Sequence, residues 1–456
     1  MTPLVHQNYL PMKRVFATWW PLAFSWVLMG AELPALSAVI ARLPNPEINL
    51  AAYGGVVFPL ALIIEAPVIM LLAASTALCK DWASYVKIRR FMMVMGGSLT
   101  ALHFLIAFTP LYYFVVETII HAPEEIVEPG RVGFMLMLPW TWSIAYRRFN
   151  QGVLIRFGHS RTISVGTLIR LGADMLILAI GYRLGDVPGI IVATLAVSAG
   201  VVSEAIYVGI VVKPVLNYEL KPAPTVSPAI TLRSFLDFYI PLAMTSLLFL
   251  LAQPIGSAAL SRMPNALASL AVWPVVSGLI FIFRSLGVAY NEVVVALLDE
   301  ANSYTSLKRF TAWLATLSSI ALLIMAATPL SEWWFSQISA LSPQLSQMAQ
   351  ITLWIAMPLP LFAVLQSWYQ GAILHGRVTR GVTEAVAIYL VLSGVLYAAG
   401  VAWATVSGIY IGVAVMGISM GAQTFWLWYR SRPVLKVIRK RDEQSELSFI
   451  AEAQLD

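Results

Sequence analysis

Long apolar segments separated by short polar ones make up most of this chain. A helix needs about 20 apolar residues to cross the hydrocarbon core of a bilayer. Twelve segments meet this requirement, at about 15–40, 49–78, 91–115, 131–155, 161–183, 188–212, 236–262, 267–297, 308–334, 346–373, 381–400 and 403–429. The pattern therefore predicts an all-α integral membrane protein with twelve transmembrane helices, in which interruptions by Pro and Gly are tolerated because neighbouring helices re-satisfy the backbone.

The chain also contains an internal repeat. Residues 21–45 (PLAFSWVLMGAELPALSAVIARLPN) and 241–265 (PLAMTSLLFLLAQPIGSAALSRMPN) are identical at ten of 25 positions, at a constant offset of 220. Two further matches occur at offset 219, between 84–91 and 303–310 and between 138–152 and 357–371; the last pair ends in Gln-Gly in both copies. A duplicated, very apolar chain is typical of a transporter built from two halves around a central site.

The repeat predicts the domain organisation. We expect an N-lobe over 1–216 with helices 1–6, a polar, Pro-rich cytoplasmic linker over 217–234, a C-lobe over 235–434 with helices 7–12, and a cytoplasmic tail over 435–456. Six spans is an even number, so both copies enter the membrane in the same orientation. A pseudo-two-fold axis along the membrane normal should relate the two lobes.

Composition and charge agree with a membrane location. The chain is 59% hydrophobic and 11% charged, whereas soluble domains carry about 25% charged residues. If both termini are cytoplasmic, 23 of the 29 Lys and Arg residues fall on the cytoplasmic side, as the positive-inside rule requires. Arg147 and Arg148 are counted there, as anchors for lipid head groups at the end of the fourth helix. We expect a multi-pass protein of a bacterial inner (plasma) membrane.

Other functional classes find little support. Cys79 is the only cysteine, the five histidines show no ligand spacing, and no nucleotide-binding motif is present. The first apolar run resembles a retained signal-anchor helix. We therefore predict no enzyme activity, no metal, no cofactor beyond a possible proton or sodium gradient, no nucleic-acid partner and a monomer whose partners are the bilayer and a small solute.

Several segments resemble the MATE and polysaccharide-flippase exporters, the MOP superfamily. They include LAAYGGVVFPL (50–60) and RRFNQGVLIRFGHSRT (147–162). The stretches AELPALSAVIA (31–41), AFTPLYYFVVETII (107–120), FNQGVLI (149–155) and QPIGSAALSR (253–262) are similar to the progressive ankylosis branch. This resemblance implies a V-shaped pair of lobes, a cleft lined largely by helices 1, 2, 7 and 8, and export by alternating access. The chain departs from that branch at Gln253, where an arginine would be expected.

Ionisable side chains within the apolar segments are the candidate functional residues, because a charge in the bilayer is costly. They are Glu32, Glu65, Arg170, Asp174, Glu204, Arg284 and Glu292. At offset 219, Glu65 corresponds to Arg284, so the two could form an ion pair between the lobes that opens and closes a gate. Alternatively, each is paired within its own lobe. Arg170 and Asp174 are spaced i, i+4 and could satisfy each other on one helix face.

Glu32 differs from the other candidates because its repeat partner, Ala252, is uncharged. Apolar surroundings favour the neutral form of a lone carboxylate, which suits proton coupling; the alternative is a structural hydrogen bond. MATE-type pumps often use an acidic residue in helix 1, and Glu32 resembles that residue. Gln151 and Gln370 each precede a glycine, a pattern that favours close helix packing over a ligand site.

These observations favour a secondary active exporter of a small organic solute over a membrane-embedded enzyme. A proton- or sodium-coupled cationic drug antiporter and a lipid-linked oligosaccharide flippase remain alternatives. Five intramembrane acids against two bases favour a cation or proton as the transported species. The ankylosis-branch resemblance implies instead an organic anion such as citrate, a nucleotide or pyrophosphate, and the sequence leaves the two open.

Overall fold

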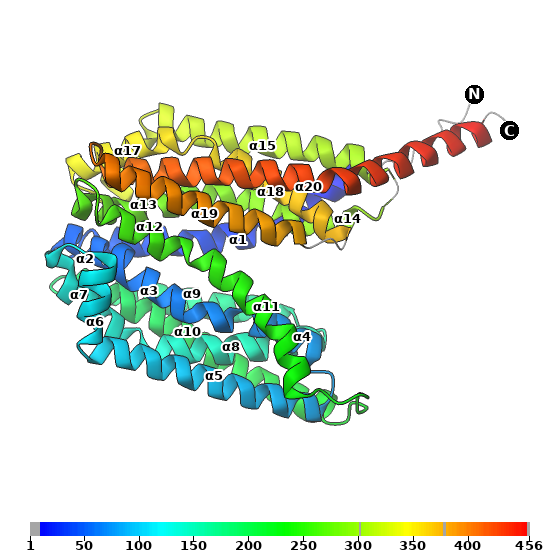
Figure 1. The fold of residues 1–456 in the computed structure, drawn as a ribbon, viewed down its shortest axis with the longest axis horizontal. Helices are drawn as coiled ribbons and strands as arrows, with labels where there is room; N and C mark the ends of the chain where they lie inside the picture. The colour runs from blue at the N-terminus through cyan, green and yellow to red at the C-terminus, as the bar shows by residue number, and fades with distance from the viewer. Residues whose placement is uncertain (1–9, 301, 377–379, 454–456) are drawn as a thin grey trace. The chain divides into compact units, whose positions relative to one another are not determined.

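The protein is an all-α assembly, described by a computed structural model over residues 10–300, 302–376 and 380–453 (Figure 1). In chain order the α-helices are α1 (Met12–Ile40), α2 (Pro46–Ala52), α3 (Phe58–Ile69), α4 (Leu71–Leu78), α5 (Trp82–Phe108), α6 (Leu111–Tyr113), α7 (Glu124–Leu136), α8 (Leu138–Arg156), α9 (Arg161–Leu184), α10 (Gly189–Val215), α11 (Leu232–Leu250), α12 (Ala252–Leu260), α13 (Ala266–Val288), α14 (Tyr290–Leu297), α15 (Ser303–Ala327), α16 (Leu330–Trp333), α17 (Pro343–Ile355), α18 (Leu359–His375), α19 (Arg380–Trp403) and α20 (Gly408–Ala453). Four π-helical segments continue α-helices, namely η1 (Tyr53–Val57), η2 (Phe114–Ile120), η3 (Leu216–Leu220) and η4 (Trp334–Ile338).

Each of the twelve predicted spans coincides with one helix or with helices broken at a short interruption. Among the described residues, ten helices are long and apolar enough to cross a membrane, and the pair α17–α18, bent by 43°, makes an eleventh. The remaining predicted span, 131–155, corresponds to α7–α8. Its hydropathy is low because it contains Arg131, Arg147 and Arg148.

The chain divides into two compact units. Unit 2 comprises residues 36–274 and 398–409. Its core is formed by α10 against α8 and α9, by α8 against α3, α4 and α5, and by α11 and α12 against α3. Asp81 begins α5 by accepting a hydrogen bond from the Ser84 backbone N–H, and its other carboxylate oxygen accepts one from the Val226 N–H. The polar segment before α11 is thereby attached to α5.

Unit 1 comprises residues 1–35, 275–397 and 410–456. Here α18 packs against α14 and α15. The first part of α1 joins this unit, since Trp19 Nε1 donates a hydrogen bond to the Leu286 carbonyl of α13 and Gly30 lies against the Phe281 ring. The 46-residue helix α20 ends the unit. Arg441 of α20 donates to the carbonyls of Leu298 and Glu300, so this helix secures the connection between α14 and α15.

The two units differ from the predicted lobes in where they place the first helix of each copy, α1 in the first copy and α11–α12 in the second. Most of α1 groups with unit 1, while α11 and α12 group with unit 2. The divisions fall directly after Pro274 in α13 and one residue after Pro34 in α1. A proline removes one helical hydrogen bond and weakens continuity at that point. The lobe boundaries 1–216 and 235–434 therefore describe the duplication, and the contacts group the chain differently.

The repeat is visible in local geometry. Arg42 donates from Nη1 to the Ala38 carbonyl at 2.7 Å, and its repeat partner Arg262 donates from Nη1 to the Ala258 carbonyl, also at 2.7 Å. Asn45 and Asn265 both have positive φ, at 51° and 55°. Asparagine is among the few residues that adopt this conformation readily, so both copies leave their first span through the same turn.

A fourth repeated motif emerges from the structure. Thr-Pro-Leu occurs at 109–111 and at 328–330, again at offset 219. Thr109 and Thr328 end α5 and α15, and each hydroxyl accepts from the backbone N–H two residues on, at 3.3 and 3.4 Å. A π-helical segment follows each turn.

Candidate functional site

A network of buried charges connects three helices in the middle of unit 2. Glu204 of α10 is fully buried, and its Oε2 forms an ion pair with Nη1 of Arg147 on α8. Gln151, one turn further along α8, donates from Nε2 to Glu204 Oε1 at 2.9 Å. Nε of Arg170 on α9 lies 3.7 Å from Glu204 Oε2. One carboxylate thus organises α8, α9 and α10.

A second carboxylate extends this network to α3. Glu65 is only 6% exposed, and it interacts electrostatically with Arg148, Arg147 and Arg170. All of these residues belong to unit 2. Glu65 therefore has basic neighbours within its own unit. The pairing of Glu65 with Arg284 between lobes stays a prediction.

Glycines on the facing helices make room for the acids. A Cβ at Gly200 of α10 would lie 1.7 Å from Oδ1 of Asp174 on α9, so the carboxylate occupies the space that a side chain would take. A Cβ at Gly166 of α9 would lie 3.3 Å from Cγ of Glu204 on α10. Each helix thus carries an acid that packs against a glycine of the other, as small residues permit in membrane interfaces.

The prediction that Arg147 and Arg148 are surface anchors for head groups is wrong for Arg147. Arg147 of α8 is 6% exposed and forms an ion pair with Glu204 of α10. Arg148 is half-buried and interacts electrostatically with Glu65 and Glu204. Arg147 and Arg148 lie nine and eight residues before the end of α8 at Arg156. This depth within the span, visible in the sequence, already indicates that the two arginines are inside the membrane segment. An arginine about two turns inside a span must find a partner in the protein.

In unit 1, Arg284 lies on α13 and is half-buried. Tyr389 of α19 is the one titratable group among the described residues that interacts with it electrostatically. The Nε–H of Arg284 is buried and donates no hydrogen bond within the described chain, as is also found for the Nε–H groups of Arg147, Arg148 and Arg170. A phenol is neutral near pH 7, so unit 1 does not neutralise this guanidinium as unit 2 neutralises its three.

The remaining predicted site residues are placed as follows. Glu32 is half-buried on α1, and Gln253 is half-buried on α12 in unit 2. Glu292 is exposed on α14, which removes it from the buried set. Gly152 and Gly371, the glycines of the repeated Gln-Gly, both lie at close helix contacts, with α4 and α14 respectively. The packing prediction for this motif is confirmed, although Gln151 additionally binds Glu204.

This placement changes the count of intramembrane charges. Adding Arg147 and Arg148 and removing Glu292 leaves Glu32, Glu65, Asp174 and Glu204 against Arg147, Arg148, Arg170 and Arg284. Among the candidates that are buried or half-buried, four acids are thus matched by four bases. This set shows no acid excess of the kind that favoured a cationic substrate. Within unit 2 the three acids and three bases balance, so uptake of one proton would leave this network with a net positive charge.

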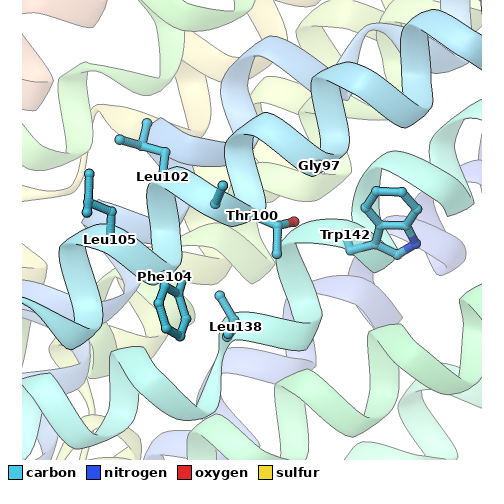
Figure 2. Close-up of a pocket in the computed structure, with 8 residues that line it drawn as sticks. Gly97, Thr100, Leu102, Phe104, Leu105, Leu138 and Trp142 are labelled. Atoms are coloured by element: carbon cyan, nitrogen blue, oxygen red, sulfur yellow. The ribbon is translucent and has the colours of Figure 1, made fainter.

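Metal ligands are not grouped in the part of the chain that the structure describes: no three His, Cys, Asp or Glu side chains lie close enough together to hold an ion. An apolar groove does occur between α5 and α8, lined by Gly97, Thr100, Leu102, Phe104, Leu105, Leu138 and Trp142 (Figure 2). Leu102, Phe104 and Leu105 are 42–51% exposed. Their apolar side chains suit lipid acyl chains and offer no charged group to a polar solute.

Comparisons with known proteins agree on the fold. No protein-family model matches the chain, and no curated protein matches it. A multidrug resistance MATE family transporter of the MOP superfamily, in an inward-facing conformation, superposes with a TM-score of 0.67 at 16% identity, covering 92% of this chain and 98% of that one. A MOP superfamily transporter from Pyrococcus furiosus, described as having a binding pocket of reverse polarity, gives a TM-score of 0.62 at 18% identity and covers 96% of this chain and 99% of that one.

The lipid II flippase MurJ, in an inward closed conformation, is also similar. Its TM-score is 0.62 at 14% identity, and the match covers 94% of this chain and 92% of that one. At these identities the comparisons establish the fold. The chain is a multi-pass, all-α membrane protein with the fold of MATE-type transporters.

Proposed function

We propose that this protein is a secondary active transporter that exports a small organic solute by alternating access. The observation that carries the proposal is the buried ion network of Glu204, Arg147, Arg170 and Glu65 inside membrane helices of a MATE-like fold. Buried charges are a poor means of stabilising a protein, and in membranes they mark substrate or ion pathways. Each matched structure named above is described as a transporter or a flippase.

An organic anion, such as citrate, a nucleotide or pyrophosphate, is the solute class we favour. The balanced count of four acids and four bases removes the argument for a cation, and Arg284 offers a positive charge that unit 1 does not neutralise. The Pyrococcus furiosus protein, whose pocket is described as of reverse polarity, indicates that this fold accommodates different pocket charges. The cationic drug antiporter and the oligosaccharide flippase are the competing assignments.

Reconstitution into proteoliposomes tests the proposal. Radiolabelled citrate, ADP and pyrophosphate, together with the lipophilic cation tetraphenylphosphonium, are offered outside vesicles preloaded with the same unlabelled compound. Counterflow of any of these solutes, absent from protein-free vesicles, supports a secondary transporter. Absence of counterflow for all of them, combined with protein-dependent translocation of a fluorescent polyprenyl-phosphate oligosaccharide, would identify a flippase instead.

A further inference from the structure

Arg284 occupies the middle of a membrane-spanning segment. It lies 18 residues after Ala266 and 13 residues before Leu297, the ends of the span formed by α13 and α14. At 1.5 Å per residue these separations are about 27 Å and about 20 Å. The span is therefore longer than the hydrocarbon core, which is about 30 Å thick, and Arg284 lies about 20 Å or more along the helix from either end of it.

The surroundings of Arg284 do not neutralise it. Its electrostatic partner among the described residues is the phenol of Tyr389, which carries no charge near neutral pH, and its buried Nε–H donates no hydrogen bond within the described chain. Three other arginines of unit 1 have carboxylate partners: Arg14 pairs with Glu300, Arg430 with Glu384, and Arg441 with Asp442. A cation left this way in an apolar span requires a compensating anion.

The two side chains are partly exposed and have a definite chemistry. Arg284 and Tyr389 are both half-buried. A guanidinium offers a planar pair of N–H donors that matches a carboxylate or a phosphate, and the phenol can donate one more hydrogen bond. Phe281, three residues before Arg284 on α13, supplies an apolar neighbour on the same helix surface, and its ring is tilted against that of Trp26 with ring centroids 6.4 Å apart.

We propose that Arg284 and Tyr389 bind the anionic group of the transported solute, a carboxylate or a phosphate, which makes small organic anions the substrate class. This inference rests on the proposed transport function and adds to it a binding residue and a charge. The solute, when bound, provides the counter-charge that unit 1 lacks. A cation would meet repulsion from the same guanidinium.

Thermal unfolding of the purified protein in nanodiscs tests the binding site without requiring transport. Citrate, ADP and pyrophosphate are titrated separately, with tetraphenylphosphonium as the cation. We expect at least one anion to raise the Tm of the wild type. Arg284→Gln should weaken that anion's binding at least tenfold, Arg284→Lys by less, and Tyr389→Phe several-fold. The control Arg439→Gln, an exposed arginine of α20 paired with Glu443, should bind as the wild type does.

The Tm of the ligand-free variants separates binding from a structural role. Removal of an uncompensated buried cation should leave the Tm of Arg284→Gln equal to or above that of the wild type. A lowered ligand-free Tm for both Arg284→Gln and Arg284→Lys, or unchanged anion affinity in the folded Arg284→Gln protein, would overturn the proposal. Counterflow of tetraphenylphosphonium with no binding of any anion would also overturn it while leaving the transport function intact.

Discussion

Arg147 of α8 and Glu204 of α10 form a buried ion pair, although 57 residues separate them in the chain. The side chain of Glu204 is inaccessible, and that of Arg147 is 8% exposed. Glu204 also accepts a hydrogen bond from Nε2 of Gln151, and Nε of Arg170 lies 3.7 Å from its Oε2. This single carboxylate therefore connects α8, α9 and α10.

The first prediction concerns the stability contributed by this pair. Glu204→Gln keeps the shape but leaves the Arg147 guanidinium without its carboxylate. Breaking one side of a buried pair costs about 3–5 kcal/mol, so we expect a clear fall in the free energy of unfolding. Arg147→Met should do the same. Equilibrium unfolding in mixed detergent, followed by circular dichroism, measures both variants.

A double-mutant cycle supplies the control for that prediction. The protein carrying both Glu204→Gln and Arg147→Met lacks the unpaired charge, so it should be more stable than the sum of the single losses implies. The coupling should exceed about 1 kcal/mol, as for residues in one network. Strict additivity of the two losses would show that the pair does not hold α8 to α10.

The second prediction concerns the contact between α8 and α4. A Cβ at Gly152 would lie 1.9 Å from Ser75 Oγ and 2.3 Å from the Leu72 carbonyl oxygen. Because backbone cannot yield as a flexible side chain can, Gly152→Ala should separate the helices and lower the yield of folded protein severalfold. The matched control is Gly172→Ala on α9, which has nothing within 4 Å of its added Cβ. Fluorescence-detected size-exclusion chromatography compares them, and equal monodisperse peaks would contradict the close contact.

The helices are predictable from the sequence alone, whereas the buried ion network is not. Apolar length alone located the spans, because each helix must satisfy its own backbone within the bilayer. A hydropathy value is assigned to each residue singly and therefore favours a surface position for Arg147 and Arg148. The burial of Arg147 depends instead on its ion pair with Glu204, which lies on another helix. Likewise, the repeat identified equivalent positions such as Arg42 and Arg262 but could not show that α1 and α11 belong to different compact units.

The third prediction concerns Asp81, which lies between α4 and α5, outside the spans. Burial tends to raise the pKa of its carboxyl, but the hydrogen bonds from Ser84 and Val226 outweigh this effect and hold the pKa below its ordinary value. A carboxyl with a lowered pKa stabilises the fold above its unfolded pKa of about 3.9. That stabilisation is lost as the pH falls through the lower folded value.

Hydrogen exchange of residues 221–231, followed by mass spectrometry, measures the Asp81 contacts. At pH 7 we expect Asp81→Ala to exchange several-fold faster than the wild type, consistent with about 1 kcal/mol for a lost cap. Asp81→Asn should fall between them, because its single amide oxygen can accept for only one of the two N–H groups at full strength. Identical exchange in Asp81→Ala and wild type would mean that Val226 is not held by Asp81.

The fourth prediction concerns topology. The distribution of Lys and Arg predicts that both termini are cytoplasmic. A reporter that is active only in the cytoplasm should function when fused after Asp456 and should fail when inserted at Pro123, which lies between η2 and α7. A periplasmic reporter at the same two sites should give the opposite pattern. Activity of one reporter at both sites would rule out the twelve-span arrangement.

The fifth prediction concerns energy coupling. The sequence contains no ATP-binding motif, so for the proposed export we expect an ion gradient or exchange with another solute to supply the energy. Glu32 lies in α1, and the equivalent position in the second copy is Ala252, so one copy alone carries a carboxylate there. Protonation removes a charge that costs about 3 kcal/mol at the centre of a membrane helix. A bias of this size shifts a two-state equilibrium by about a hundredfold.

Glu32→Gln imitates the protonated state, so we expect it to retain solute binding while losing transport driven by a pH gradient. The measurement is uptake into proteoliposomes with and without an imposed pH gradient, for wild type and variant. Glu292→Gln is the matched control, since Glu292 is exposed on α14 and should keep its response to the gradient. A variant at Glu32 whose uptake still follows the gradient would exclude this residue from coupling. The next candidates would then be Glu65, Asp174 and Glu204, whose charges are balanced by the arginines of unit 2 and whose protonation would release those arginines.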